Sequence, residues 1–277
     1  MRFYTIAAAA FICASQASAQ SVARMLESDL TNAGKDVWGV YSSPFKGSGK
    51  DWAKVGGALA LTAASMVLDK PVERWAQDND SASAFKLIEP LRRGGWLFSG
   101  KYVVPPVAGL YVIGLATNNQ NLRDGVIGCG ASWFAQSTSR KIFYRLVGRR
   151  RPETSPDDNH DWAVPNRTSG KAGWQMRAFP AGHFGNAMAC ASFLGIRFDM
   201  GLAEPAVYGV AVGVALGRAL DHAHWTSDHV LGRIFGYAVG KEVARRSLNR
   251  KRAAASPSIS ASPSARGGFT MSFNWRF

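Results

Sequence analysis

Residues 217–228 read GRALDHAHWTSD, a stretch that places two histidines, two aspartates and an arginine close together. Arg218 precedes His224 by six positions, and Asp228 follows His224 by four. If His224 opens a helix, His224 and Asp228 lie on one face of it. The carboxylate can then hold the Nδ1 proton of the imidazole and point Nε2 toward a substrate. A histidine prepared in this way is a competent nucleophile toward phosphorus, and Arg218 offers a planar fork for phosphate oxygens.

Two more patches upstream contain residues that could take part in catalysis or anion binding. Residues 179–183 read FPAGH and form a turn that leads into an apolar, helix-like segment. A helix N-terminus binds anions through its free N–H groups, which brings in Gly182, and His183 can act there as a general acid. Residues 148–152 read GRRRP, and Pro152 holds Arg151 at the exit of a predicted helix. Phosphoryl transfer needs mainly positioning and charge neutralisation, so these groups suffice without a metal ion.

Together the three patches resemble the type-2 phosphatidic-acid phosphatase (PAP2) superfamily, which includes bacterial acid phosphatases, lipid phosphatases and vanadium haloperoxidases. The family pattern is Lys, six residues, Arg-Pro; then Pro-Ser-Gly-His; then Ser-Arg, five residues, His, three residues, Asp. The resemblance implies an all-α, single-domain helical bundle of the PAP2/haloperoxidase type. It implies His224 as nucleophile, Asp228 as its orienter and His183 as the acid. It implies Arg151 and Arg218 as phosphate-binding residues.

Three positions depart from the family pattern. Tyr144 stands where the pattern has its lysine, seven residues before Arg-Pro, and Lys141 or Arg145 could supply the missing cation from nearby. Ala181 replaces the serine of Pro-Ser-Gly-His, and loss of such a donor can cost about a hundred- to a thousandfold in rate. Gly217 replaces the serine before Arg218, which is a milder change. The first two departures leave open a phosphate-binding protein that has lost turnover.

Most of the chain is expected to be helical, because apolar residues dominate and strand-like alternation is missing. Glu204-Pro205 indicates one helix start, since proline is tolerated in a first turn, and Gly148 is expected to cap another helix at its C-terminus. Residues 152–176 hold several Pro, Asp and Asn and are expected to form a long functional loop. The predicted helices are 52–75, 102–117, 122–147, 185–198, 205–219 and 228–249.

The hydropathy of the chain favours a soluble bundle over an integral membrane protein. Hydrophobic residues make up 47% of the chain, but charged residues interrupt or flank the apolar segments. A membrane-spanning helix needs about 20 mostly apolar residues, and the mean hydropathy is only −0.09. Segments 56–68 and 103–116 are the ones that could overturn this expectation.

Both ends of the chain differ in composition from its centre. Residues 1–19 have a basic start, a short apolar run and small residues at Ala17 and Ala19, which predicts a removable secretory signal and a periplasmic protein. The phosphatase-like domain is expected to span residues 20–250. An Ala/Ser/Pro-rich flexible linker at 251–268 follows. Residues 269–277 alternate apolar and polar side chains up to a terminal Phe277, which is a strand pattern and would need a partner edge. A tail that packs on its own domain or stays disordered is the alternative that we favour.

After removal of that signal two cysteines remain, Cys129 and Cys190. An oxidising compartment would permit a disulfide between them. Two buried free thiols fit the sequence equally well, because free cysteine is among the most buried residue types. Both alternatives stay open.

The formal net charge of +14 favours anionic partners. We expect a phosphorylated small molecule or a lipid headgroup, with association at a membrane surface or the outer membrane, and no nucleic acid. No cofactor is expected. A metal site at residues 221–229 is not favoured, because side chains two residues apart diverge on a helix. Arg149 and Arg150 are expected to be solvated charges, and the oligomeric state stays open.

The function expected from these residues is hydrolysis of phosphate monoesters by a metal-independent phosphatase through a phosphohistidine intermediate. One alternative is a lipid or prenyl-diphosphate phosphatase at the membrane surface. A second is a vanadate-dependent haloperoxidase, and a third is the degenerate phosphate-binding protein.

Overall fold

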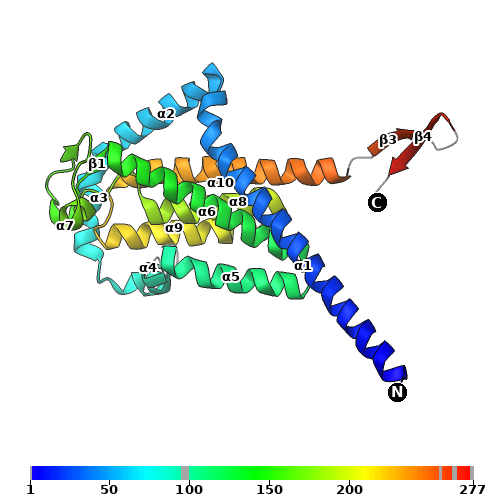
Figure 1. The fold of residues 1–277 in the computed structure, drawn as a ribbon. Coiled ribbons are helices and arrows are strands. Elements are labelled where there is room, and N and C mark those ends of the chain that lie inside the picture. The colour runs from blue at the N-terminus through cyan, green and yellow to red at the C-terminus, as the bar shows by residue number, and fades with distance from the viewer. Residues whose placement is uncertain (1, 95–99, 256–257, 264–266, 275–277) are drawn as a thin grey trace.

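Helices form nearly all of the structure, a computed structural model that describes residues 2–94, 100–255, 258–263 and 267–274 (Figure 1). The expected all-helical fold is confirmed. The α-helices are α1 (Arg2–Ser42), α2 (Gly49–Ser65), α3 (Asp69–Asn79), α4 (Glu89–Gly94), α5 (Gly100–Ala116), α6 (Gln120–Leu146), α7 (Gly170–Gln175), α8 (Gly182–Phe198), α9 (Glu204–Leu220) and α10 (Thr226–Ala255). Short 3₁₀ turns are η1 (Ser43–Lys46), η2 (Met66–Leu68), η3 (Ser83–Ile88), η5 (Pro152–Thr154) and η6 (Gly201–Ala203).

Two small antiparallel hairpins complete the described part of the chain. β1 (Gly148–Arg149) pairs with β2 (Trp162–Ala163), and β3 (Ser258–Pro263) pairs with β4 (Phe269–Asn274). In the second hairpin Ser258 lies opposite Asn274 and Pro263 opposite Phe269. Figure 1 shows this hairpin beyond the C-terminal end of α10, away from the helical bundle.

Helix α8 lies at the centre of the bundle, with α6, α9 and α10 packed around it (Figure 1). The closest packing joins α10 to α8, and a row of glycines on α10 permits it. A Cβ on Gly232 would stand 2.7 Å from the carbonyl oxygen of Ala181, and a Cβ on Gly236 or Gly240 would collide with the α8 backbone. These glycines recur every fourth residue, so they line one face of α10.

Apolar side chains fill the space around α8 in two groups. One joins α6, α8 and α10 around the fully buried Phe193 and Val243. The other lies between α8 and α9 around Met188 and Val214. Small residues such as Ala135 and Ala189 contribute to the first group, which explains how the helices approach so closely.

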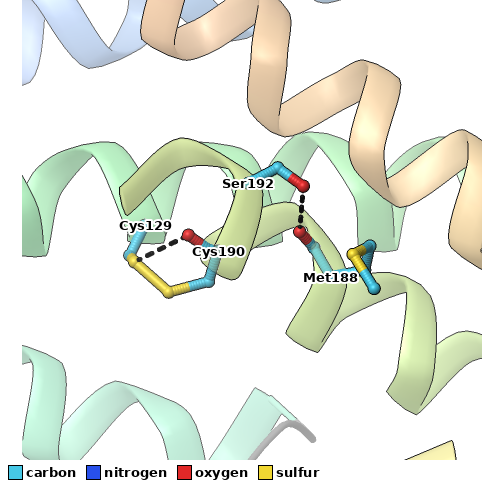
Figure 2. Close-up of a disulfide and its surroundings, with 4 residues drawn as sticks. All are labelled: Cys129, Met188, Cys190 and Ser192. Atoms are coloured by element: carbon cyan, nitrogen blue, oxygen red, sulfur yellow. Dashed lines mark hydrogen bonds between the residues drawn. A yellow bond between two sulfur atoms is a disulfide. The ribbon is translucent and has the colours of Figure 1, made fainter. Parts of the chain in front are cut away.

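A disulfide joins α6 to α8 and decides between the two alternatives for the cysteines. Cys129 and Cys190 are paired, with Cα atoms 4.5 Å apart. Figure 2 shows the bond between the two helix ribbons, in the same turn of α8 as the hydrogen bond that the Ser192 hydroxyl donates to the Met188 carbonyl. The helix that follows residues 179–181 is therefore covalently linked to the helix that precedes residues 148–152.

Several boundaries differ from the sequence predictions. The helix expected at 52–75 is divided by η2 into α2 and α3, so that Asp69 begins a new helix. Gly148 is not a helix cap: Val147 ends α6 in an extended conformation, and Gly148 begins β1. It is glycine because a Cβ there would lie 2.5 Å from the Asn166 amide nitrogen. The start of α9 agrees with the Glu204-Pro205 signal.

The two ends of the chain also differ from expectation. Helix α1 runs without a break from Arg2 to Ser42 and so includes residues 2–19. In the Ala/Ser/Pro-rich segment, where a flexible linker was expected, α10 continues to Ala255 and β3 occupies Ser258–Pro263. Strand β4 agrees with the predicted alternation and β3 is its partner edge; Trp275 and Phe277 lie outside the described residues. The signal peptide and its cleavage stay a prediction.

One apolar stretch has the length and composition to cross a membrane, among the residues described. It covers Gly49–Asn79, and its most apolar 18-residue window has a mean hydropathy of 1.2 and is only 17% buried. It contains the 56–68 segment that the sequence marked for this reason. The Val103–Ala116 segment is apolar but shorter.

Candidate active site

Backbone hydrogen bonds bring the three patches of the sequence together. Arg149 in β1 donates its N–H to Met176 and accepts from the Ala178 N–H, both at 3.1 Å. The Ala178 carbonyl in turn accepts a hydrogen bond from His224 at 2.6 Å. The N–H of Ala181 donates to the Asp228 carbonyl at 3.0 Å. These bonds hold the three patches, which are far apart in the chain, at fixed positions relative to one another.

His224 lies just before α10, and its ring is 3% exposed. Its Nδ1 bonds to the Ala178 carbonyl, which can only accept, so Nδ1 carries the proton and Nε2 keeps its lone pair. Burial, followed by the positive charge of Arg151, lowers the pKa of His224 well below its ordinary value. The imidazole is therefore neutral at pH 7 and in the tautomer that a nucleophile needs. A carbonyl does here what the sequence led us to expect from Asp228.

Asp228 is fully buried and holds the start of α10. One oxygen accepts the Trp225 N–H at 2.8 Å, and the other accepts from the Arg149 guanidinium at 2.7 Å. Burial raises the pKa of Asp228 to about 6, while Arg149 opposes that rise. This carboxylate therefore fixes the backbone beside His224 and no hydrogen bond between the two side chains is found.

Arg149 is the centre of this buried network, so the expectation that it is a solvated charge was wrong. Its side chain is 0% exposed and bonds to both Asp69 at 2.6 Å and Asp228 at 2.7 Å. The carbonyl of Asn159 and the hydroxyl of Ser227 accept its remaining donors. Removal of one partner from a buried ion pair typically costs about 3–5 kcal/mol. Arg150 is partly exposed, as expected, and pairs with Asp161.

His183 is the second residue of α8, where the first N–H groups of the helix have no intrahelical acceptor. Burial and then the charges of Arg218, Arg140 and Arg151 lower its pKa to about 3. Its Nδ1 is buried without a hydrogen-bond partner among the described residues. Gly182, which precedes it, supplies a backbone N–H at the same helix end. Both positions fit the expected anion site.

Arg151 and Arg218 approach the two histidines from different elements. The guanidinium of Arg151 stacks 4.0 Å from the centre of the Trp174 ring, and Glu153 is a distant partner at 3.9 Å. Arg218 near the end of α9 bonds to Asp221 at 2.6 Å. Asp221 also accepts from Arg92 at 2.6 Å, which ties α4 to the site. Both arginines lower the pKa of His183 and of His224, so their charge reaches both rings.

Arg140 lies beside Tyr144 and the start of α8. Lys141 and Arg145 are both exposed, and the structure does not bring either to the site. Arg140 lies there instead, with its guanidinium carbon 5.3 Å from the centre of the Tyr144 ring. The sequence signal that could have found Arg140 is its spacing, because it lies four residues before Tyr144 and residues four apart share a helix face.

Three guanidinium groups share one unusual property. The Nε atoms of Arg140, Arg151 and Arg218 are each buried and have no acceptor within the described part of the chain. A buried donor without a partner costs about 1–3 kcal/mol, and more when it is charged. Such donors are normally satisfied, so this group has the chemistry of a site for a multivalent oxyanion.

Aromatic side chains from the expected loop enclose this end of the bundle. The segment 152–176 contains η5, β2 and α7, and it carries Trp162 and Trp174. Trp162 packs edge-on against Phe179 at 5.2 Å, and Trp174 covers Arg151 at 4.0 Å. Trp225 is buried and donates its indole N–H to the Arg150 carbonyl at 2.9 Å.

Of the other histidines near the motif, His222 has a hydrogen-bond partner, whereas both ring nitrogens of His229 are buried without one among the described residues. His222 bonds to Glu73 at 2.8 Å, and His229 lies against His224 with ring centres 5.5 Å apart. Within the ranges that the structure describes, no group of three or more His, Cys, Asp or Glu side chains could hold a metal ion.

Two comparisons with known proteins give a match. Residues 126–252 match the family model described as the PAP2 superfamily. Among solved structures, the chain is similar to a transmembrane PAP2-type phosphatidylglycerolphosphate phosphatase from Bacillus subtilis. The identity is 16% and the TM-score 0.43, over 70% of this chain and 92% of that one. The comparison with curated proteins gives no match. The segment 126–252, which is similar to the PAP2 superfamily, holds all three patches, from Arg151 through His183 to Asp228.

Proposed function

We propose that this chain is a metal-independent phosphatase that transfers a phosphoryl group to His224. The observation that carries the proposal is the group of buried, unsatisfied guanidinium Nε atoms around two neutral histidines. The match of residues 126–252 to the PAP2 superfamily model supports phosphatase chemistry in general, and the geometry supports this form of it.

The first half of the reaction forms a phosphohistidine. The Nε2 lone pair of His224 attacks phosphorus, an N–P bond forms, and the P–O bond to the leaving group breaks. The negative charge of the bound phosphate raises the pKa of His183 so that its ring takes up a proton, and this imidazolium donates the proton to the leaving oxygen. Arg151 and Arg218 neutralise the charge on the equatorial oxygens.

The second half regenerates the enzyme. His183, now neutral, accepts a proton from water as the water oxygen attacks phosphorus. The N–P bond breaks and inorganic phosphate leaves. The bond from Nδ1 of His224 to the Ala178 carbonyl stays in place throughout and keeps the ring oriented. With no hydroxyl at Ala181, the N–H groups of Gly182 and His183 at the start of α8 are the backbone donors to phosphate.

A second candidate substrate class is a phosphorylated lipid or prenyl diphosphate. The observation that favours it is the apolar surface of α2, where Trp52 is 55% exposed and Leu61 57% exposed. An exposed apolar surface of this kind marks a membrane or partner contact more often than a solvated face. The disulfide between Cys129 and Cys190 supports an oxidising location such as the periplasm.

The test is phosphate release by the purified chain in the presence of EDTA. Substrates are p-nitrophenyl phosphate, a nucleotide, and phosphatidic acid and a prenyl diphosphate in detergent. We expect release that survives EDTA, and a His224→Ala variant that loses roughly 10³-fold or more of kcat. His160→Ala is the matched control, because His160 is exposed in the 152–176 segment.

The same assay separates the rival functions. Acid-labile, base-stable phosphate on the trapped protein would identify phosphohistidine. Preference for the lipid substrates would favour the membrane-surface enzyme. If His224→Ala turns over like the parent protein, the nucleophile is wrongly assigned. Phosphate binding without release would identify the degenerate binder, and EDTA-sensitive release would contradict the metal-independent mechanism.

A further inference from the structure

One face of α6 lies against the start of α8 and carries Arg140, a charged side chain to which the proposed mechanism gives no role. Gln136, Arg140 and Tyr144 are spaced four residues apart, so they form one row along the helix. Tyr144 stands at the position of the family lysine, but its hydroxyl bonds to the Pro180 carbonyl at 3.3 Å. Tyr144 therefore supports the turn before His183 and supplies no charge there.

Arg140 reaches the same turn from one helical turn earlier. Its guanidinium carbon stands 2.5 Å from the point where a Cβ on residue 182 would lie. The group therefore occupies the space beside Gly182, at the N-terminus of α8, and glycine at this position makes room for it. Stacking against the Tyr144 ring holds the planar group on this side of α6.

Two further observations connect Arg140 with an anion rather than with a structural partner. Its Nε is buried and has no acceptor among the described residues, like the Nε atoms of Arg151 and Arg218. Its charge also lowers the pKa of His183, as do the charges of those two arginines. Arg140 thus acts on the same ring, that of His183, as Arg151 and Arg218, and it does so from α6.

The length of the arginine side chain explains how Arg140 can serve in place of a lysine at position 144, one helical turn away. One helical turn is about 5.4 Å along the axis, which a long arginine side chain can span while its planar fork still meets two oxygens. Lysine, a point charge on a flexible stem, would lose that geometry.

We propose that Arg140 is a phosphate-binding residue of this chain, in the role that the family gives to a lysine at position 144. This inference rests on the proposed function for the identity of the anion. It adds a site residue that the family motif does not mark.

The first test measures the affinity of the full chain for inorganic phosphate by calorimetry. Arg140→Met keeps the volume of the stem and removes the charge. We expect its phosphate Kd to be about 10- to 100-fold weaker, which is the usual effect of losing a charge-assisted hydrogen bond. Arg145→Met is the matched control, since Arg145 is exposed on the same helix, and its Kd should stay within about twofold.

The second test moves the charge back to the family position. The double variant Arg140→Met with Tyr144→Lys should recover most of the lost affinity, and Arg140→Lys should be intermediate. Thermal unfolding checks that each protein folds. If Arg140→Met itself does not fold, Arg140→Lys and the double variant still decide the question.

The outcomes separate this inference from the proposed function. An Arg140→Met protein that binds phosphate like the parent, while Arg218→Met does not, would overturn the role of Arg140 alone. A parent protein that binds no phosphate would contradict both. A parent that binds phosphate without hydrolysing it would contradict only turnover, and the Kd series would still test Arg140.

Discussion

At the scale of single residues, a backbone group orients the ring of His224, the nucleophile of the proposed mechanism. The carbonyl of Ala178 holds Nδ1, and Asp228 holds the N–H of Trp225. The His-Asp spacing in the sequence correctly marked two neighbours. The spacing could not show whether the two side chains bond to each other. It assumed that His224 begins a helix, whereas His224 lies before the first residue of α10.

His183 has a pKa of about 3 because it is buried beside positive charge, although an acid must carry a proton. A bound oxyanion supplies negative charge between the arginines and His183 and so raises that pKa. By linkage, anion affinity then rises as pH falls through the raised value, and it levels off below the free value near 3.

We therefore predict that sulfate, which stays dianionic throughout, binds more tightly as pH falls from about 8 to about 5, by up to about tenfold per unit. Calorimetry over this range measures the slope. His183→Asn should flatten it, and His160→Asn should leave it unchanged. An unaltered slope in His183→Asn would mean that the proton is taken up elsewhere.

At the scale of elements, two features hold the site helices at fixed separation. The glycine row of α10 lets it approach the backbone of α8, and the disulfide links α8 to α6. Regular helices for most of the bundle could be predicted from apolar patterning. The division between α2 and α3 could not, since it depends on Asp69 reaching Arg149 from another part of the chain.

The disulfide should contribute strongly to stability, because it closes a loop with a sequence separation of 61 residues. Restriction of the unfolded chain predicts a loss of about 4 kcal/mol when both cysteines become alanine. Urea denaturation of the parent and of Cys129→Ala/Cys190→Ala measures it. Reductant should destabilise the parent and have no effect on the double variant. Equal stability of the two oxidised proteins would mean that the bond is not formed.

At the scale of the whole molecule, the exposed apolar surface and the positive charge point to the same partner. The chain carries a formal charge of +14, and α2 exposes Leu59 at 51% and Leu61 at 57%. The low mean hydropathy of −0.09 does not indicate this apolar surface, because it averages apolar helices with a strongly basic remainder. Anionic membranes attract basic proteins, and exposed apolar helices add affinity that salt does not screen.

We predict that the chain co-sediments with anionic phospholipid vesicles and that added salt weakens this binding without abolishing it. Leu59→Glu/Leu61→Glu should lower the bound fraction by roughly tenfold or more, since burial of each leucine contributes about 1.5–3 kcal/mol. Gln120→Glu/Asn121→Glu makes the same charge change at exposed positions of α6 and should have a smaller effect. Complete loss of binding in salt would mean that the attraction is electrostatic alone.

The sequence by itself determined the helical class of the fold and the residues of the three motifs, because periodicity and motif spacing are local properties of the chain. Only the tertiary structure decided that Arg149 is buried, that Cys129 and Cys190 pair, and that Arg140 lies at the site in place of Lys141 or Arg145. Each of these depends on which helix faces which. An arginine has the same local signature whether it faces water or two buried carboxylates, and only long-range packing distinguishes the two.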